Sequence, residues 1–81
     1  MKAEYLVEMM NDIGAFFEAE SGHSDAPKSV ASHVTRFWDP RMRREIIAHY
    51  QKGGGAGLSD VSLKAVVLLA QQAADKSSGV H

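Results

Sequence analysis

Side chains that could carry chemistry are few in this sequence and poorly grouped. The four histidines, His23, His33, His49 and His81, do not follow the spacing of zinc ligands, and there is no cysteine to supply a thiolate. The carboxylates show no pair placed to share a proton, and Ser59 is explained as a helix cap rather than as a nucleophile. We therefore expect no active site, no metal and no cofactor in this chain.

Residue types that favour protein–protein contact are concentrated in one stretch. This stretch, residues 33–44, holds the only tryptophan and all four arginines of the chain, and the arginines fall within nine residues. Tryptophan, arginine and methionine are enriched at the centres of protein interfaces, and the planar guanidinium suits carboxylates. We expect Trp38 and Arg41 to be the anchors of a partner-binding surface. The predicted partner-binding residues are His33, Arg36, Phe37, Trp38, Pro40, Arg41, Met42, Arg43 and Arg44.

Two other interpretations of this stretch stay open. Trp38 could instead lock a corner between two helices from inside the core, with the arginines merely solvated. The Arg36–Arg44 basic cluster could also bind the phosphates of RNA or DNA, in a small helical nucleic-acid-binding or regulatory module. The first segment argues against nucleic acid, because residues 1–25 carry one lysine and six acids and would repel a polyanion.

The spacing of apolar residues predicts an all-α fold, a small bundle of three to four short helices. A first helix is expected over residues 3–20. A second should have Ser24 or Asp25 as its cap and end near Trp38, because Pro40 follows. The second helix should carry one stripe of Val30, His33, Val34 and Phe37. The apolar face of the first is Leu6, Met9, Met10, Ile13, Phe16 and Phe17. Met9 and Met10 are expected in the core, with a partner surface as the alternative.

The second half of the chain should contain two more helices. Asp39 is expected to cap a third helix over residues 40–51, which the following glycines end. Ser59 is expected to cap a fourth helix. This last helix is apolar nearly all round at residues 63–70, so it should lie centrally in the bundle or be buried against a partner.

Length and composition limit what the chain can be. Its 81 residues allow one domain, which we place at residues 1–74, followed by a disordered tail at 75–81. Glu4 and Glu8 interrupt any apolar signal segment, and no apolar run approaches the roughly 20 residues that a membrane span needs. We therefore expect a cytoplasmic protein that contacts no membrane.

The stretch at residues 33–44, which holds the predicted partner-binding residues, resembles a known family. His33…Phe37-Trp38-x-Pro40-Arg41-Met42-Arg43 is similar to the signature of the delta subunit of soluble, NAD-dependent molybdenum formate dehydrogenases. Leu6-Val7-x-Met9-x-Asn11-x-Ile13-x-x-Phe16-Phe17 resembles the opening helix of that family, and Leu58…Val61 resembles the entry to its last helix. The resemblance covers about residues 4–70. It departs from the family's pattern near Asp60, where a proline would be expected and the sequence has none.

This resemblance implies a non-catalytic accessory subunit that supports the assembly or stability of a formate dehydrogenase by binding its large alpha subunit. In such enzymes the alpha subunit carries a bis-molybdopterin guanine dinucleotide cofactor and iron–sulfur clusters, and beta and gamma subunits pass electrons through flavin to NAD. The delta subunit holds none of these groups. From the charge and hydropathy of the sequence itself we expect neither nucleic acid nor membrane as a partner. The lack of cysteine agrees with this, since thiolates hold iron–sulfur clusters.

Overall fold

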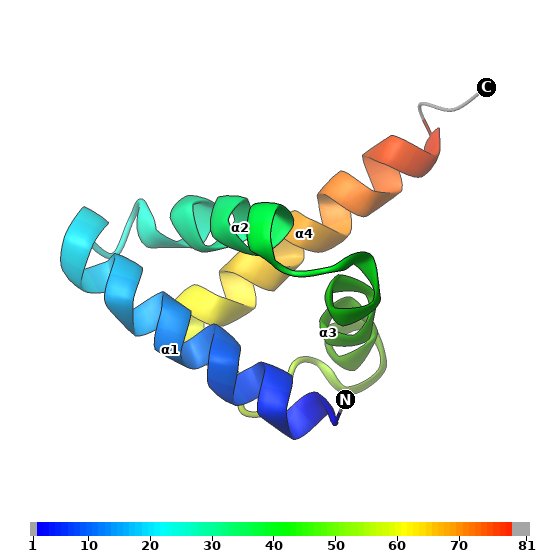
Figure 1. The fold of residues 1–81 in the computed structure, drawn as a ribbon, viewed down its shortest axis with the longest axis horizontal. Helices are drawn as coiled ribbons and strands as arrows, with labels where there is room; N and C mark the ends of the chain where they lie inside the picture. The colour runs from blue at the N-terminus through cyan, green and yellow to red at the C-terminus, as the bar shows by residue number, and fades with distance from the viewer. Residues whose placement is uncertain (1, 79–81) are drawn as a thin grey trace.

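Four helices make up the part of the chain that the structure describes. The structure, a computed structural model, describes residues 2–78, with side chains through residue 75. No strand occurs in that range, so the predicted all-α bundle is confirmed. The last turns of α4 extend beyond the other helices (Figure 1). In chain order the helices are α1 (Ala3–Ser21), α2 (Ala26–Phe37), α3 (Pro40–Gly53) and α4 (Asp60–Ser78).

Helix α4 contacts α1, α2 and α3 (Figure 1), and α1 likewise contacts the three other helices. Because its neighbours approach from several sides, an apolar residue on almost any side of its first turns finds cover. Of the two predicted positions, central in the bundle or buried against a partner, the contacts with α1, α2 and α3 agree with the first, and burial against a partner stays a prediction. Its buried residues are Val61, Ser62, Ala65, Val66 and Leu69, and Leu63, Val67, Leu68 and Ala70 are half-buried.

The buried face of α1 is rotated from the predicted one. Leu6, Met10 and Gly14 are buried, whereas Met9 is 37% exposed and Phe16 is 57% exposed. The predicted apolar face is wider than the part of α1 that contacts other helices. Because α4 packs closely at Gly14, the buried side of α1 lies away from Met9 and Phe16. The core position expected for Met9 was therefore wrong, and Phe16, on the same apolar face, is exposed as well.

The end of α2 also differs from its predicted stripe. Val30 and Val34 are buried as expected and His33 is half-buried, but Phe37 is 69% exposed. The chain leaves helical geometry after Phe37, and it is the next residue, Trp38, that enters the core at this end of the helix.

Two of the predicted helix caps form. The Asp39 carboxylate accepts a hydrogen bond of 2.9 Å from the Met42 amide at the start of α3. The Ser59 hydroxyl accepts one of 3.2 Å from the Ser62 amide in the first turn of α4. Asp25 does precede α2, but its backbone is already helical and its side chain makes no capping bond. Capping side chains satisfy amides that have no partner inside the helix, so these two starts are encoded locally.

Two helix ends lie beyond their predicted positions. Helix α3 runs on to Gly53, and Gly54 then takes a left-handed conformation with φ of 72°. Helix α4 continues to Ser78, through residues where we expected a disordered tail to begin at position 75. Ala73 and Ala74 are strong helix formers, which favours continuation of the helix into solvent. Residues 79–81 of the expected tail lie outside the described residues.

Polar groups on α1 tie it to the start of α4. The Asn11 side-chain amide donates to the Gly57 carbonyl, and its oxygen accepts from the Ser59 amide, each at 2.9 Å. The buried Ser62 hydroxyl donates to the Met10 carbonyl at 2.9 Å. These three bonds position α1 against the α4 entry and so hold the α1 face described below.

Candidate partner-binding surface

Trp38, the first of the two predicted anchors, lies in the core. Only 6% of its surface is exposed, and it joins the same buried cluster as Val34 and Ile46. Met42 is half-buried and packs against that cluster. Trp38 therefore locks the corner between α2 and α3 from inside, and it offers a partner almost no surface.

Arg43 also has a structural role, because its side chain bonds to the backbone of α2. Its Nη1 atom donates to the Trp38 carbonyl at 2.6 Å and to the Thr35 carbonyl at 3.0 Å. Carbonyls at a helix C-terminus lack partners within the helix and carry partial negative charge, so a guanidinium there both bonds them and complements the helix dipole. Arg43, from the first turn of α3, thus caps the end of α2.

The other predicted residues face solvent to different degrees. Arg36, Arg41 and Arg44 are exposed, as are Phe37 and Pro40, and His33 is half-buried. Sequence spacing could not separate Arg43 from its neighbours, because all four arginines belong to one short stretch. The structure divides the stretch into an inner side that builds the corner and an outer side that is free to bind.

The outer side joins a row of aromatic rings that runs from α1 to α2. Ring centroids of Phe16 and Phe17 are 5.0 Å apart, those of Phe17 and His33 are 5.7 Å apart, and those of His33 and Phe37 are 4.7 Å apart. The Arg36 guanidinium carbon lies 5.8 Å from the Phe37 centroid, within the range of a cation–π contact. We call Phe16, Phe17, His33 and Phe37 the aromatic row.

Two hollows border the aromatic row. The one towards α2, of about 370 Å³, is lined by Phe17, His33 and Phe37 together with Lys28, Ser29, Ser32 and Arg36. The other, of about 310 Å³, is lined by Phe16, Phe17 and His33 together with Asp12 and Ile13 of α1. The two hollows therefore differ in charge: the first carries two cations and no carboxylate, and the second carries a carboxylate.

This difference follows the charges of the two helices. Helix α1 contains five acidic residues and no lysine or arginine, whereas α2 contains Lys28 and Arg36 and no acidic residue. The aromatic row lies where these helices meet. Phe16 and Lys28 line these hollows but were not among the predicted binding residues, because Phe16 belongs to the apolar face of the first helix and Lys28 stands alone in the sequence.

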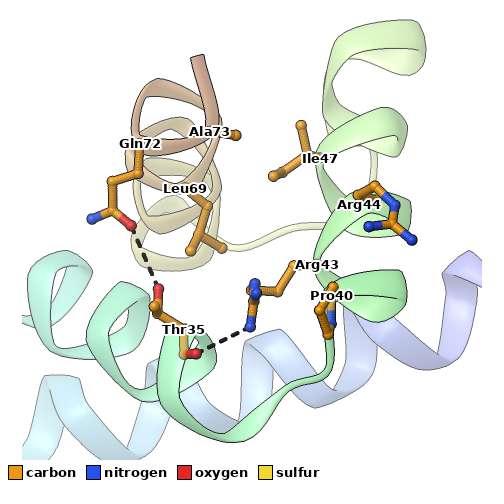
Figure 2. Close-up of a pocket in the computed structure, with 8 residues that line it drawn as sticks. All are labelled: Thr35, Pro40, Arg43, Arg44, Ile47, Leu69, Gln72 and Ala73. Carbon is orange, nitrogen blue, oxygen red and sulfur yellow. Dashed lines mark hydrogen bonds between the residues drawn. The ribbon is translucent and has the colours of Figure 1, made fainter. Parts of the chain in front are cut away.

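A separate, smaller pocket of about 180 Å³ lies between the end of α2, the start of α3 and the later part of α4 (Figure 2). Figure 2 shows Arg43 of α3 donating to the Thr35 carbonyl. It also shows the Thr35 hydroxyl donating to the side-chain oxygen of Gln72, at a distance of 3.5 Å. Its size falls below the usual range of small-molecule sites. The pocket is lined by Thr35, Pro40, Arg43, Arg44, Ile47, Leu69, Gln72 and Ala73.

Away from these surfaces, His23 links the end of α1 to the start of α4. Its Nδ1 lies 2.6 Å from the Glu18 carboxylate and its Nε2 lies 3.1 Å from that of Asp60. The hydrogen bond and the charge of Glu18 raise the pKa of His23, with a smaller contribution from the charge of Asp60, while desolvation and Lys64 oppose the rise. This arrangement is an exposed, pH-sensitive contact between two helix ends.

Two classes of feature are absent from the described part of the chain. No three His, Asp or Glu side chains there converge as ligands of a metal ion. None of its helices combines the length and the apolar character needed to cross a membrane.

Comparison with known proteins identifies one family. The family model for the NADH-dependent formate dehydrogenase delta subunit FdsD matches residues 5–66. The match includes α2 and α3 entirely and therefore covers the aromatic row and the α2–α3 corner. No curated protein and no solved structure matches the chain.

Proposed function

The chain belongs to the family of NADH-dependent formate dehydrogenase delta subunits, and we propose that it is a non-catalytic accessory subunit that binds the large alpha subunit. In this role it supports the assembly or stability of the complex. The observation that carries the proposal is the family match, which spans residues 5–66. Catalysis and its redox groups, the molybdenum cofactor, the iron–sulfur clusters and the flavin, then belong to the other subunits.

The exposed side of the predicted surface supports this role. Phe37 leaves 69% of its surface in water, and Arg36, Arg41 and Arg44 lie exposed on the same stretch. Aromatic and arginine side chains are the types that dominate binding energy at protein interfaces. None of these four is needed to fill the core, so all of them remain available to a partner.

A nucleic-acid partner is less well supported. The aromatic row and its arginine could stack on bases and bind phosphate. However, the row is shared with α1, which has five acidic residues and places Asp12 at the edge of the row. A polyanion that approached the row would meet that negative charge.

The proposal is tested by removing the chain from the complex. We expect the alpha subunit, expressed with beta and gamma but without this chain, to be recovered in lower yield or to melt at a lower temperature. Purified chain added back should co-elute with the alpha subunit and raise its melting temperature, because a ligand that binds only the native state stabilises it by mass action. Unchanged yield and melting, together with no co-elution, would show that the chain is not an accessory subunit of this enzyme.

A further inference from the structure

We propose that the aromatic row is the docking site for an amphipathic helix of the alpha subunit, with acidic residues along one edge of that helix. This inference rests on the proposed function and replaces the predicted anchors Trp38 and Arg41 with Phe16 and Phe37. It is carried by the exposure of the row and by the opposite charges of its two hollows.

Exposure is the first argument. Phe16 and Phe37 are more than half exposed, and they are brought to opposite ends of one row although 21 positions separate them in the sequence. A contiguous apolar patch rimmed by polar residues is typical of a protein-binding site. The row already has ordered geometry, since each ring contacts the next, so binding would not need to arrange these side chains.

An amphipathic helix fits a row of this kind. Such a helix carries one apolar stripe between polar edges, and the row is an apolar strip with charged side chains beside it. The hollows beside the row can receive side chains of that stripe.

Charge determines which edge of the helix faces which side. The α2 hollow exposes Lys28 and Arg36, and Arg36 is held over the Phe37 ring. An acidic edge on the partner would meet these two cations. The opposite edge would face Asp12 at the α1 hollow, where a basic or neutral residue fits. Complementary charge of this kind fixes the orientation of a docked helix.

The test uses the alpha subunit purified as a tagged complex that lacks this chain, and the affinity of labelled chain for it. Phe16→Ser and Phe37→Ser should each weaken binding about tenfold or more, as expected for anchors at the centre of an interface. Arg36→Glu should weaken it as well, and the loss should shrink at high salt because charges are screened. Melting of each free variant should stay near that of the wild type, since these side chains are exposed.

Two matched controls are available in the chain. Tyr5 is an aromatic residue of α1 that is 58% exposed and lines neither hollow, so Tyr5→Ser should leave affinity unchanged. Lys52 is an exposed cation in the last turn of α3, so Lys52→Glu controls for charge reversal.

Other outcomes would overturn the inference. If the wild-type chain binds but Phe16→Ser and Phe37→Ser bind equally well, while Arg41→Glu and Arg44→Glu do not, the contact is at the α2–α3 corner. A dimer of the free chain that both Phe variants abolish, with binding to alpha intact, would assign the row to a second copy. Binding of single-stranded RNA that needs Phe37 would assign it to nucleic acid. If the wild-type chain does not bind alpha at all, the proposed function itself fails.

Discussion

Gly14 of α1 faces Ser62 of α4 so closely that a Cβ atom on Gly14 would stand 2.8 Å from the Ser62 hydroxyl oxygen. That hydroxyl is not free to move aside, because it donates to the Met10 carbonyl and contacts the Ser59 hydroxyl. The absence of a side chain at Gly14 therefore sets how closely α1 approaches α4, and with it the position of the α1 part of the aromatic row.

Gly14→Ala should lower the free energy of unfolding. Alanine favours a helix over glycine by about 1 kcal/mol, but the clash and the disturbed buried hydrogen bond cost about 1–3 kcal/mol each. We expect a net loss of about 1 kcal/mol or more in urea unfolding. Adding Ser62→Ala should recover part of this loss, because the double variant removes the clashing oxygen. Strictly additive effects of the two substitutions would contradict the contact.

Arg43→Ala should destabilise the free chain, whereas Arg44→Ala should not. Arg43 loses two charged hydrogen bonds to the last carbonyls of α2, which we expect to cost about 1–2 kcal/mol. Arg44 is an exposed neighbour of the same type, and its loss should stay within about 0.5 kcal/mol. Thermal or urea unfolding of the two variants tests the difference. Equal melting of both would show that Arg43 has no capping role.

Trp38→Ala should be among the most disruptive changes in this chain. A buried tryptophan replaced by alanine typically costs about 3–5 kcal/mol, which is a large share of the stability of a domain of this size. The adjacent Phe37→Ala is the matched control, since Phe37 is mostly exposed and should change stability little. Circular dichroism and melting of the free chains decide the matter. A native-like melt for Trp38→Ala would place this residue outside the core.

The His23 contact should make stability depend on pH. Its pKa is raised in the folded state, chiefly by the hydrogen bond to Glu18, so protonated His23 is favoured by folding. The stabilisation is therefore complete below the unfolded pKa of about 6.5 and is lost as pH rises through the higher folded pKa.

His23→Gln removes this contribution. We expect the difference in melting temperature between wild type and His23→Gln to be larger near pH 6 than near pH 8.5, by the linkage of proton binding to folding. Glu18→Gln removes the main cause of the raised pKa of His23, so it should abolish most of this pH-dependent difference. A wild-type advantage that grows with pH would have the wrong sign for this contact.

Local features of the sequence determined the helices and the starts of α3 and α4. Asp39 followed by Pro40, and Ser59 before an apolar run, act on amides within three residues, so no knowledge of the rest of the chain is needed. The composition of α1 and α2, acidic in one and basic in the other, is likewise visible in the sequence. The family was also identified from motifs in the sequence, and the match over residues 5–66 confirms it.

Only the tertiary structure decided which residues of a given type are buried and which are free. Phe37 and Trp38 are neighbours, yet the turn after α2 sends one into water and the other into the core. Arg43 and Arg44 are equally adjacent, and only Arg43 meets the carbonyl end of α2. Burial depends on contacts between helices distant in sequence. Residue type and periodicity set how wide the apolar faces are, and the packing of α1, α2 and α3 on α4 selects the part of each face that is covered.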